Sequence, residues 1–259
     1  MILRRLGNKK KIAKEIQKYF PPHKIYIEPF FGAGGMFFNK PKAKYNIVND
    51  LDSNVFNLFQ LITENKEQLE NELRITPIHS DLFDYWKNNK QKESIKKAVC
   101  FLFMSNLLIP TTGDINRKGY DKGKDLMLSN LDLTINFLEK TNIRFFNEDC
   151  IQFIDSIGLR GLERPKEDAN MFIYCDPPYL GTSNNYENGF TEEQSNNLFD
   201  SLIKKNIKFA MSEFDNEFIL DQAKERGLNV IIIGERQNLK NRRTEILVTN
   251  YSNNQQSLF

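Results

Sequence analysis

The sequence predicts an α/β protein with a doubly wound, mostly parallel sheet of the Rossmann-like kind and one helical insertion. Strand-like runs alternate with helix-like runs, which is typical of such a sheet. The first of these strands opens into a glycine-rich turn, and residues 57–140 are charged, mostly helical and poor in strands. We therefore expect residues 1–56 and 141–259 to form one domain, with residues 57–140 inserted into it.

Each predicted element follows from a local pattern in the sequence. Apolar residues recur at helical spacing before Pro21 and Pro22, which cannot continue a helix, and again over residues 53–62. A turn-forming, basic stretch over residues 110–125 interrupts the helices of the insertion. Strands are expected at residues 25–27 and 45–50 and within residues 142–150, 171–179, 207–214, 229–235 and 244–251.

The charge of the chain is nearly balanced overall but unevenly distributed. Its 36 Lys and Arg residues against 34 Asp and Glu residues give a net charge of +2. Basic residues cluster near the start (Arg4, Arg5, Lys9, Lys10, Lys11, Lys14, Lys18) and near the end (Arg236, Lys240, Arg242, Arg243). Such clusters suit a phosphate-binding face, and they also occur on ordinary solvated surfaces, so both interpretations stay open.

Composition argues against several classes of protein. Cys100, Cys150 and Cys175 are odd in number and lack the spacing of metal ligands, which indicates a reduced, cytoplasmic chain without a metal. His23 and His79 are the only histidines, which disfavours a His-centred zinc site or a Ser-His-Asp triad. The sequence contains no stretch apolar and long enough to cross a membrane, and we expect a monomer without a membrane partner.

A glycine-rich turn and an acid indicate a nucleoside-containing cofactor. Gly32 and Gly34 follow the first strand and let the main chain pass close to a ligand. Their spacing is not the full GxGxxG pattern, which argues against NAD. Asp50 ends the next strand, where an acid can bind both hydroxyls of a ribose. The alternative is that Asp50 only caps a helix beside Asp52 and Ser53.

The stretch "MFIYCDPPY" combines residue types that suit an exocyclic aromatic amine. Pro177 and Pro178 end the strand because neither has an N–H to donate, which leaves Asp176 at its carboxyl end. The Asp176 carboxylate and the Pro177 carbonyl can accept both hydrogens of an amino group, which draws its nitrogen towards tetrahedral geometry. Tyr179 offers a face on which a base can stack after leaving the duplex.

These motifs together resemble the Dam-type DNA adenine methyltransferases, which use S-adenosylmethionine. "LGNKKKI" is similar to the family's N-terminal element, "EPFFGAGG" to its glycine loop, "NDLDSNVF" to its acidic strand end and "DPPY" to its catalytic motif. "GFTEEQSNNL" and "RRTEILVTNY" are similar to its later segments. The order of glycine loop, recognition insert and Asp-Pro-Pro-Tyr is that of the alpha group of amino-methyltransferases.

The resemblance implies a function and a set of site residues. It implies a site-specific adenine methyltransferase that flips its target base, with a catalytic domain of residues 1–56 and 141–259 and a target-recognition insertion of residues 57–140. Catalysis would use Asp176, Pro177, Pro178 and Tyr179. Cofactor contacts would come from Arg5, Lys9, Phe31, Gly32, Gly34, Asp50, Asp149, Cys150 and Asp176. Arg5 stands where family members usually carry an aromatic residue.

The insertion is expected to contact double-stranded DNA. Asn116, Arg117, Lys118 and Tyr120 are candidates for groove and phosphate contacts, because Arg can read guanine edges and Lys mostly meets phosphate. The stretch keeps the basic, turn-rich character of the family but not its usual residues, so no recognition sequence is implied. A mobile loop with solvated charges is the alternative.

Other functions remain open at this point. The same chemistry could act on cytosine in DNA, adenine in RNA or a protein glutamine, although Asp176 as the first residue of the motif favours adenine. A non-catalytic DNA-binding subunit could keep the fold, but it would not need a cofactor pocket. A cognate restriction endonuclease could accompany the enzyme, or the enzyme could act alone.

Overall fold

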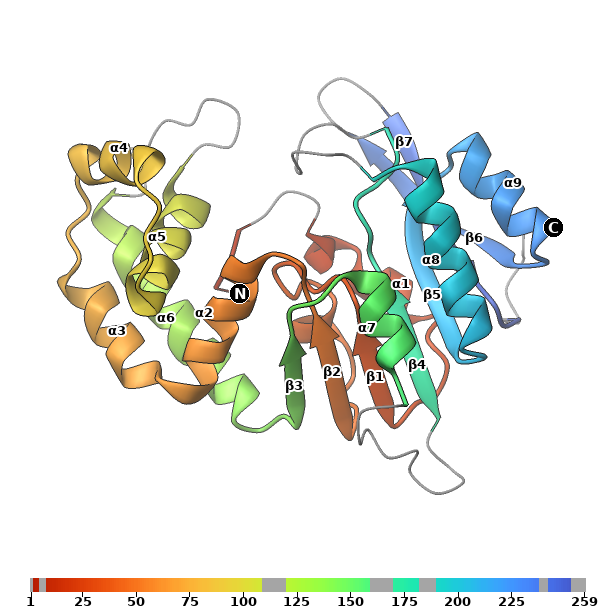
Figure 1. Ribbon diagram of the computed structural model, residues 1–259, viewed down its shortest axis with the longest axis horizontal. Coiled ribbons are helices and arrows are strands. Elements are labelled where there is room, and N and C mark those ends of the chain that lie inside the picture. The colour runs from red at the N-terminus through yellow and green to blue at the C-terminus, as the bar shows by residue number, and fades with distance from the viewer. Residues whose placement is uncertain are drawn as a thin grey trace.

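In the described part of the chain, seven strands form one sheet with helices on both faces (Figure 1). The computed structural model describes residues 2–4, 8–108, 120–158, 170–181, 190–237 and 242–252. The strand order is β3-β2-β1-β4-β5-β7-β6. The strands are β1 (Ile25–Glu28), β2 (Tyr45–Asn49), β3 (Ile143–Phe146), β4 (Met171–Cys175), β5 (Lys208–Phe214), β6 (Asn229–Gln237) and β7 (Arg242–Thr249).

The pairing of the strands confirms the predicted doubly wound sheet. Neighbouring strands from β3 to β5 in this order pair in parallel. Strand β7 pairs antiparallel with both β5 and β6. The chain runs outwards in one direction from β1 through β2 to β3, and in the other from β4 to β5. Open α/β sheets bind ligands at the carboxyl ends of the strands where this direction reverses, here between β1 and β4.

The strand β7 brings a late segment of the chain to that same edge. Because β7 runs against β5, its first residues lie beside the last residues of β5, with Glu245 opposite Phe214. Strand β6 carries an irregularity between Ile232 and Gly234, and Gly234 also pairs with Glu245. A bulge of this kind kinks a strand and redirects nearby side chains.

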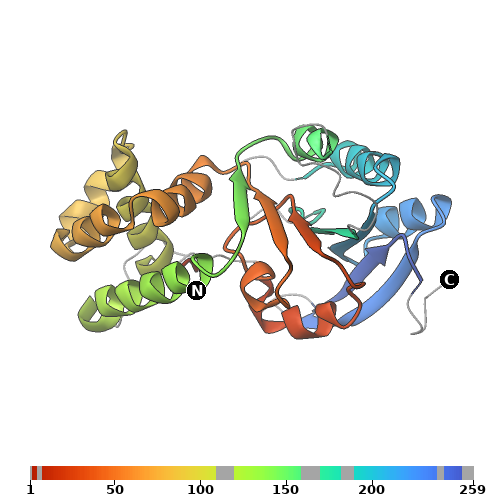
Figure 2. The same cartoon turned by 90° about the horizontal axis from the view of Figure 1, so that it is seen from below.

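Two layers of apolar side chains cover the sheet. On one face, Ile246 and Val248 of β7 belong to a cluster with residues of α7 (Cys150–Ser156), α8 (Glu192–Lys204) and α9 (Glu217–Glu225). On the other face, Leu247 belongs to a cluster that includes Ala13 and Ile16 of α1 (Ala13–Gln17). Figure 2 shows the sheet between these layers. The alternation along β7 is that of a strand buried on both sides.

The insertion consists of helices packed beside β3 and connected between β2 and β3 (Figure 1). They are α2 (Ser53–Glu64), α3 (Lys66–Ile75), α4 (Ser80–Asn88), α5 (Ser94–Leu107) and α6 (Tyr120–Leu138). Helix α2 begins four residues before the expected boundary at residue 57, because Asp52 caps it by accepting a hydrogen bond from the main-chain N of Asn54 at 2.9 Å. The division of the chain into two domains stays a prediction.

The insertion and the sheet share one apolar core. Phe59 of α2 stacks on Phe145 of β3 with ring centroids 5.3 Å apart, and its ring meets Phe31 edge-on at 4.9 Å. The same buried cluster continues to Leu102 of α5 and Leu131 of α6. Removing these aromatic contacts would expose apolar surface on both parts. The insertion is therefore packed against the sheet and not merely connected to it by the chain.

Part of the stretch expected to be a loop is helical. Residues 120–125 form the first turns of α6, which corrects the prediction of turns up to residue 125. The glycine that suggested a turn, Gly123, has a packing role: a Cβ there would lie 2.7 Å from Leu107 Cδ2 of α5. In the described ranges, no helix combines the length and apolar character needed to cross a membrane.

Candidate active site

The Asp-Pro-Pro-Tyr stretch lies where the sequence predicts, directly after β4. Strand β4 ends at Cys175, and Asp176 follows at the carboxyl edge of the sheet beside the end of β1. The Asp176 side chain keeps 20% of its surface exposed, whereas Pro177 is buried. The prolines therefore end the sheet at an edge that solvent still reaches.

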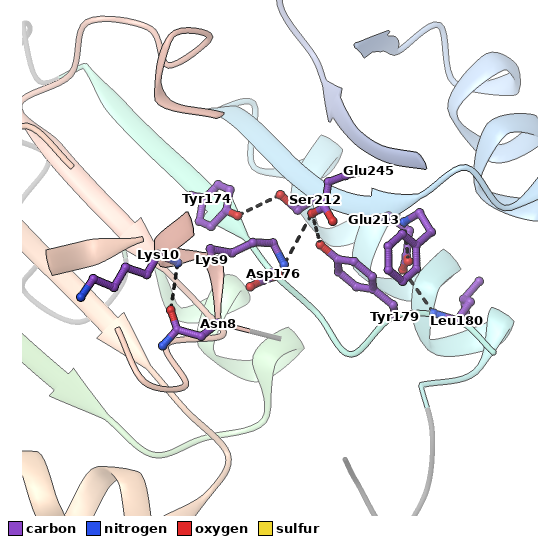
Figure 3. A network of polar contacts seen from close by, with 11 residues as sticks. Asn8, Lys9, Lys10, Tyr174, Asp176, Tyr179, Leu180, Ser212, Glu213 and Glu245 are labelled. Atoms are coloured by element: carbon purple, nitrogen blue, oxygen red, sulfur yellow. Dashed lines mark hydrogen bonds and ion pairs between the residues drawn. The ribbon is translucent and has the colours of Figure 1, made fainter. Parts of the chain in front are cut away.

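A buried lysine pairs with Asp176 (Figure 3). Lys9 Nζ lies 2.6 Å from Asp176 Oδ1 and 3.5 Å from Glu245 Oε1, and the Lys9 side chain is 3% exposed. Lys10 and Lys11 of the same one-turn helix η1 (Lys9–Lys11) point to solvent. A buried ammonium is tolerated only when it is paired, and here two carboxylates flank it. Lys9 is thus part of the site and not of a solvated run.

Tyr179 is fixed on three sides. Its Oη donates a hydrogen bond to Glu245 Oε1 at 2.5 Å, and its ring meets the Phe214 ring edge-on with centroids 4.6 Å apart. Lys9 Nζ lies 4.4 Å from the centre of the Tyr179 ring. Burial raises the pKa of Tyr179 well above its usual value, and the charges of Asp176 and Glu245 add to the effect. The phenol therefore stays protonated as a hydrogen-bond donor.

A second buried acid holds the segment after the motif. Glu213 of β5 accepts hydrogen bonds from the main-chain N of Leu180 at 3.3 Å and from that of Phe214 at 2.8 Å. Burial raises the pKa of Glu213 to about 8. Beside it, Tyr174 Oη and Ser212 Oγ lie 2.8 Å apart and join β4 to β5 (Figure 3).

The glycine loop after β1 is tied to the end of β2. Asp50 Oδ2 accepts a hydrogen bond from the main-chain N of Gly32 at 2.5 Å, and Oδ1 accepts one from the main-chain N of Asp52 at 2.8 Å. Gly32 has φ of +55° and Gly34 has φ of +71°, where glycine is favoured. A Cβ on Gly32 would meet no heavy atom within 4 Å, so the loop borders open space at Gly32, whereas a Cβ on Gly34 would lie 2.5 Å from the ring of Phe38. Asp52, not Asp50, is the helix cap.

Comparison with known protein families decides the identity of this arrangement. The family model for D12 class N6 adenine-specific DNA methyltransferases matches residues 6–239 of the chain. The chain belongs to this family. The resemblance that the motifs indicated is thereby confirmed, and the protein is an adenine-specific DNA methyltransferase by family.

Individual relatives agree with this D12-class assignment. A DNA adenine methylase of Escherichia coli (strain K12) is 24% identical over 245 residues, which cover 87% of this chain and 84% of the relative. A type II methyltransferase of Lactococcus lactis subsp. cremoris is 23% identical, with 95% of this chain and 94% of the relative covered. The solved rRNA methyltransferase aviRa of Streptomyces viridochromogenes aligns over 95% of this chain and 85% of its own with 11% identity and a TM-score of 0.41, a likeness too distant to carry an argument.

Within this D12-class methyltransferase, the predicted cofactor residues do not all face the same space. Phe31 is 3% exposed and its ring packs in the aromatic core, where it meets Phe59 edge-on. Asp149 caps α7 by accepting hydrogen bonds from Ile151 N at 2.9 Å and Gln152 N at 3.3 Å. Cys150 is half-buried, and burial raises the pKa of its thiol to about 12. Arg5 lies outside the described residues.

The predicted DNA contacts fall almost entirely outside the described residues. Asn116, Arg117 and Lys118 lie in the undescribed stretch 109–119. Tyr120 begins α6, but its side chain is not described. Their roles stay predictions. In the described ranges, no group of three or more His, Cys, Asp or Glu residues could hold a metal ion.

The structure adds residues that the sequence did not single out. Glu245 and Glu213 join the site from β7 and β5, and their distance along the chain hides them from any local motif. Leu51, next to Asp50, is 70% exposed. Glu28, the last residue of β1, is 1% exposed and accepts a hydrogen bond from Tyr26 Oη at 2.8 Å. The sequence signal that could have indicated Leu51 is its position directly after Asp50, at the end of the second strand.

Proposed function

We propose that this chain transfers a methyl group from S-adenosylmethionine to the 6-amino nitrogen of adenine in double-stranded DNA. Family membership supports the reaction class. The observation that carries the residue assignment is the position of Asp176, which is partly exposed at the carboxyl edge between β1 and β4 and fixed by Lys9 at 2.6 Å. Such an edge is where a cofactor and a substrate can meet.

The amine-binding role rests on what this site offers to a weak nucleophile. Among the described residues, the Lys9 ammonium bonds Oδ1 of Asp176, and a carboxylate has further acceptor sites for the amine. The carbonyl of Pro177 is the second acceptor that we assign to the amine, since a proline brings no competing N–H. Two acceptors placed in advance stabilise the charge that develops on nitrogen during the transfer.

The cofactor fits the loop that β1 and β2 build. The open space beside Gly32 accommodates a ligand close to the main chain, and the carboxylate of Asp50, which accepts a hydrogen bond from Gly32 N, is of the type that binds ribose hydroxyls at a strand end. The exposed Leu51 offers an apolar contact to the adenine of the cofactor. When bound, S-adenosylmethionine supplies an electrophilic methyl group. This loop therefore carries the cofactor and Asp176 the amine.

The target adenine must leave the duplex to reach Asp176, because the 6-amino group is enclosed within the stacked helix. The Tyr179 ring is 8% exposed, with the ammonium of Lys9 over it. A base that stacks on this ring must share the site with Lys9 or displace it. We assign to Tyr179 the role of receiving the flipped base because of its place in the Asp-Pro-Pro-Tyr motif beside Asp176, and not because of its exposure.

Two biological settings are consistent with the relatives of this chain. The relatives include DNA adenine methylases and a type II methyltransferase, so a solitary enzyme and a partner of a cognate restriction endonuclease both remain proposals. The monomeric state also stays a prediction.

Mapping of methylated bases tests the proposed reaction. Unmethylated genomic DNA is incubated with the protein and S-adenosylmethionine, and modified bases are located by sequencing and identified by mass spectrometry. We expect N6-methyladenine within a defined short sequence. Methylation of cytosine only, or of RNA only, would show that the substrate assignment is wrong.

The Asp176→Ala and Asp176→Asn variants test the catalytic assignment. We expect both to lose methyl transfer by at least about 100-fold, the scale for removing a group that stabilises the transition state. The fold should survive, because Lys9 keeps Glu245 at 3.5 Å. Asp200→Asn is the matched control, since Asp200 pairs with Arg226 on the surface of α8. Near-normal activity of a folded Asp176→Asn variant would contradict the assignment.

A further inference from the structure

Glu245 is a buried acid that reaches the catalytic motif from the far end of the chain. It is the fourth residue of β7 and 1% exposed. The antiparallel direction of β7 places it opposite Phe214, the last residue of β5, and opposite Gly234 beside the irregularity of β6. The strand pairing therefore directs a carboxylate to the edge of the sheet where Asp176 lies.

One oxygen of Glu245 contacts two groups of the site. Oε1 accepts the Tyr179 hydroxyl hydrogen at 2.5 Å and lies 3.5 Å from Lys9 Nζ (Figure 3). The same Lys9 Nζ contacts Asp176 at 2.6 Å and lies over the Tyr179 ring at 4.4 Å. Glu245, Tyr179 and Lys9 thus contact one another, and Lys9 connects this group to Asp176.

We propose that Glu245 is a positioning residue that holds the Tyr179 ring and the Lys9 ammonium so that Asp176 and Tyr179 are preorganised for the target base. The inference deepens the proposed function and rests on it. Glu245 does not touch the reacting atoms: its carboxylate acts through the phenol and the ammonium.

The chemistry of Glu245 suits a positioning role better than a purely structural role in the apolar core. A buried carboxylate is costly to desolvate, and an apolar residue of similar size would usually serve stability as well or better. Its Oε1 instead accepts a hydrogen bond from a phenol whose ring is already wedged against Phe214. A hydrogen bond to a charged acceptor fixes the position of the phenol oxygen, and with it the outer end of the Tyr179 side chain. Preorganised contacts of this kind lower the barrier without reorganisation during the reaction.

Four variants test the inference: Glu245→Ala, Glu245→Gln, Tyr179→Phe and the double variant Glu245→Ala/Tyr179→Phe. For each, kcat and KM are measured with tritiated S-adenosylmethionine and unmethylated genomic DNA, cofactor affinity by titration calorimetry, and folding by thermal denaturation. Tyr251→Phe is the matched control, because Tyr251 is 9% exposed and donates its hydroxyl hydrogen to the main-chain O of Tyr19 at 2.9 Å.

We expect Glu245→Ala to lower kcat by about 10-fold to 100-fold, the range for losing a hydrogen bond to a charged group. Cofactor affinity should change little. Glu245→Gln should recover much of the loss, since its amide oxygen can still accept from Tyr179. The double variant should lose no more than Glu245→Ala alone, because the hydroxyl acts through Glu245. Tyr251→Phe should lower stability but leave kcat unchanged.

Several results would overturn the inference. A folded Glu245→Ala variant with unchanged kcat would show that Glu245 is only structural, and multiplying effects in the double variant would show that Glu245 and Tyr179 act independently. If Glu245→Ala does not fold, Glu245→Gln and Tyr179→Phe are used instead. The positioning role would be refuted if both of these variants had the same kcat as the unchanged protein. An unchanged protein that methylates no DNA would instead overturn the proposed function, and the inference with it.

Discussion

Lys9 shows how strongly the environment of one residue depends on contacts that are distant in sequence. It is one of three adjacent lysines, yet only Lys9 is buried, at 3% exposure, and it pairs with Asp176, which is 167 residues away along the chain. A buried ammonium is stable here because Asp176 and Glu245 compensate its charge. Local sequence cannot distinguish Lys9 from Lys10 or Lys11, because the difference arises only when β4 and β7 pack against η1.

At the same scale, Glu213 makes the stability of the protein depend on pH. Its pKa is raised by burial to about 8, above the usual value of 4.5, so between these values the folded protein retains a proton that the unfolded chain loses. The free energy of unfolding therefore falls as pH rises from about 4.5 to 8, by up to about 1.4 kcal/mol per pH unit, and the effect levels off above pH 8.

The Glu213→Gln variant should lack this dependence while keeping one acceptor oxygen, which can serve the main-chain N of either Leu180 or Phe214, since the two bond different oxygens of Glu213. Urea denaturation of both proteins between pH 5 and pH 9 measures it. We expect the stability of the unchanged protein to decline relative to the variant up to about pH 8 and then to run parallel. A difference that stays constant over the whole range would mean that Glu213 does not titrate in this window.

At the scale of elements, the N-terminal segment and the glycine loop fit each other closely. A Cβ on Gly35 would lie 2.3 Å from Asn8 Oδ1 and 2.9 Å from the main-chain N of Lys9. Asn8 caps η1 by accepting a hydrogen bond from the main-chain N of Lys10 at 2.9 Å. The third glycine of the loop is therefore required by packing, because it lets η1 approach closely enough for Lys9 to reach Asp176.

The Gly35→Ala variant should push η1 away from the loop and weaken the pairing of Lys9 with Asp176. We expect a loss of stability of about 1–3 kcal/mol, the usual cost of overpacking, and a lower rate of DNA methylation. Gly227→Ala is the matched control: Gly227 has φ of +64°, so alanine is strained there, but its Cβ would meet nothing within 4 Å. If Gly35→Ala and Gly227→Ala lose stability equally and both keep full activity, the packing role of Gly35 is wrong.

The elements themselves were largely predictable, and the exceptions have physical reasons. The strands from residue 25 onwards follow from short apolar runs bounded by turn formers, and each was confirmed. The first turns of α6 lie within the stretch 110–125, whose many turn formers predict a loop, and one of these turn formers, Gly123, instead packs against Leu107. The motif at Asp176 was recognisable because its residues are adjacent. Glu245 was not, because only the antiparallel pairing of β7 brings it to Tyr179, 66 residues away.

At the scale of the whole molecule, the shared core joins the helical insertion to the sheet that carries the candidate active site. The apolar cluster that contains Leu69 of α3 and Phe103 of α5 also contains Tyr26 of β1 and Ala210 of β5. The main-chain O of Ile2 accepts a hydrogen bond from Asn106 Nδ2 of α5 at 2.9 Å. The chain start is thus attached to the insertion a few residues before Lys9 enters the site. We expect the insertion and the sheet to unfold together rather than as independent domains.

The near-neutral charge of the molecule requires that DNA binding depend on local basic clusters. The net charge is +2, so attraction to phosphate cannot come from the chain as a whole. Arg117 and Lys118, which lie outside the described residues, are the predicted cluster of the insertion. Each phosphate contact releases counterions, so the logarithm of the DNA affinity falls with the logarithm of the salt concentration by about 0.9 for each contact.

The double variant Arg117→Ala/Lys118→Ala should therefore bind duplex DNA more weakly and with a smaller salt dependence, by up to about 1.8 in slope if both residues meet phosphate. Cofactor affinity should not change, because the glycine loop and Asp50 are untouched. Fluorescence anisotropy over a salt series measures the slope, and calorimetry the cofactor. The control Lys204→Ala/Lys224→Ala removes two exposed charges from the last turns of α8 and α9, at the opposite edge of the sheet. Equal losses of DNA affinity in the two double variants would remove Arg117 and Lys118 from the DNA-binding face, because only net charge would then matter.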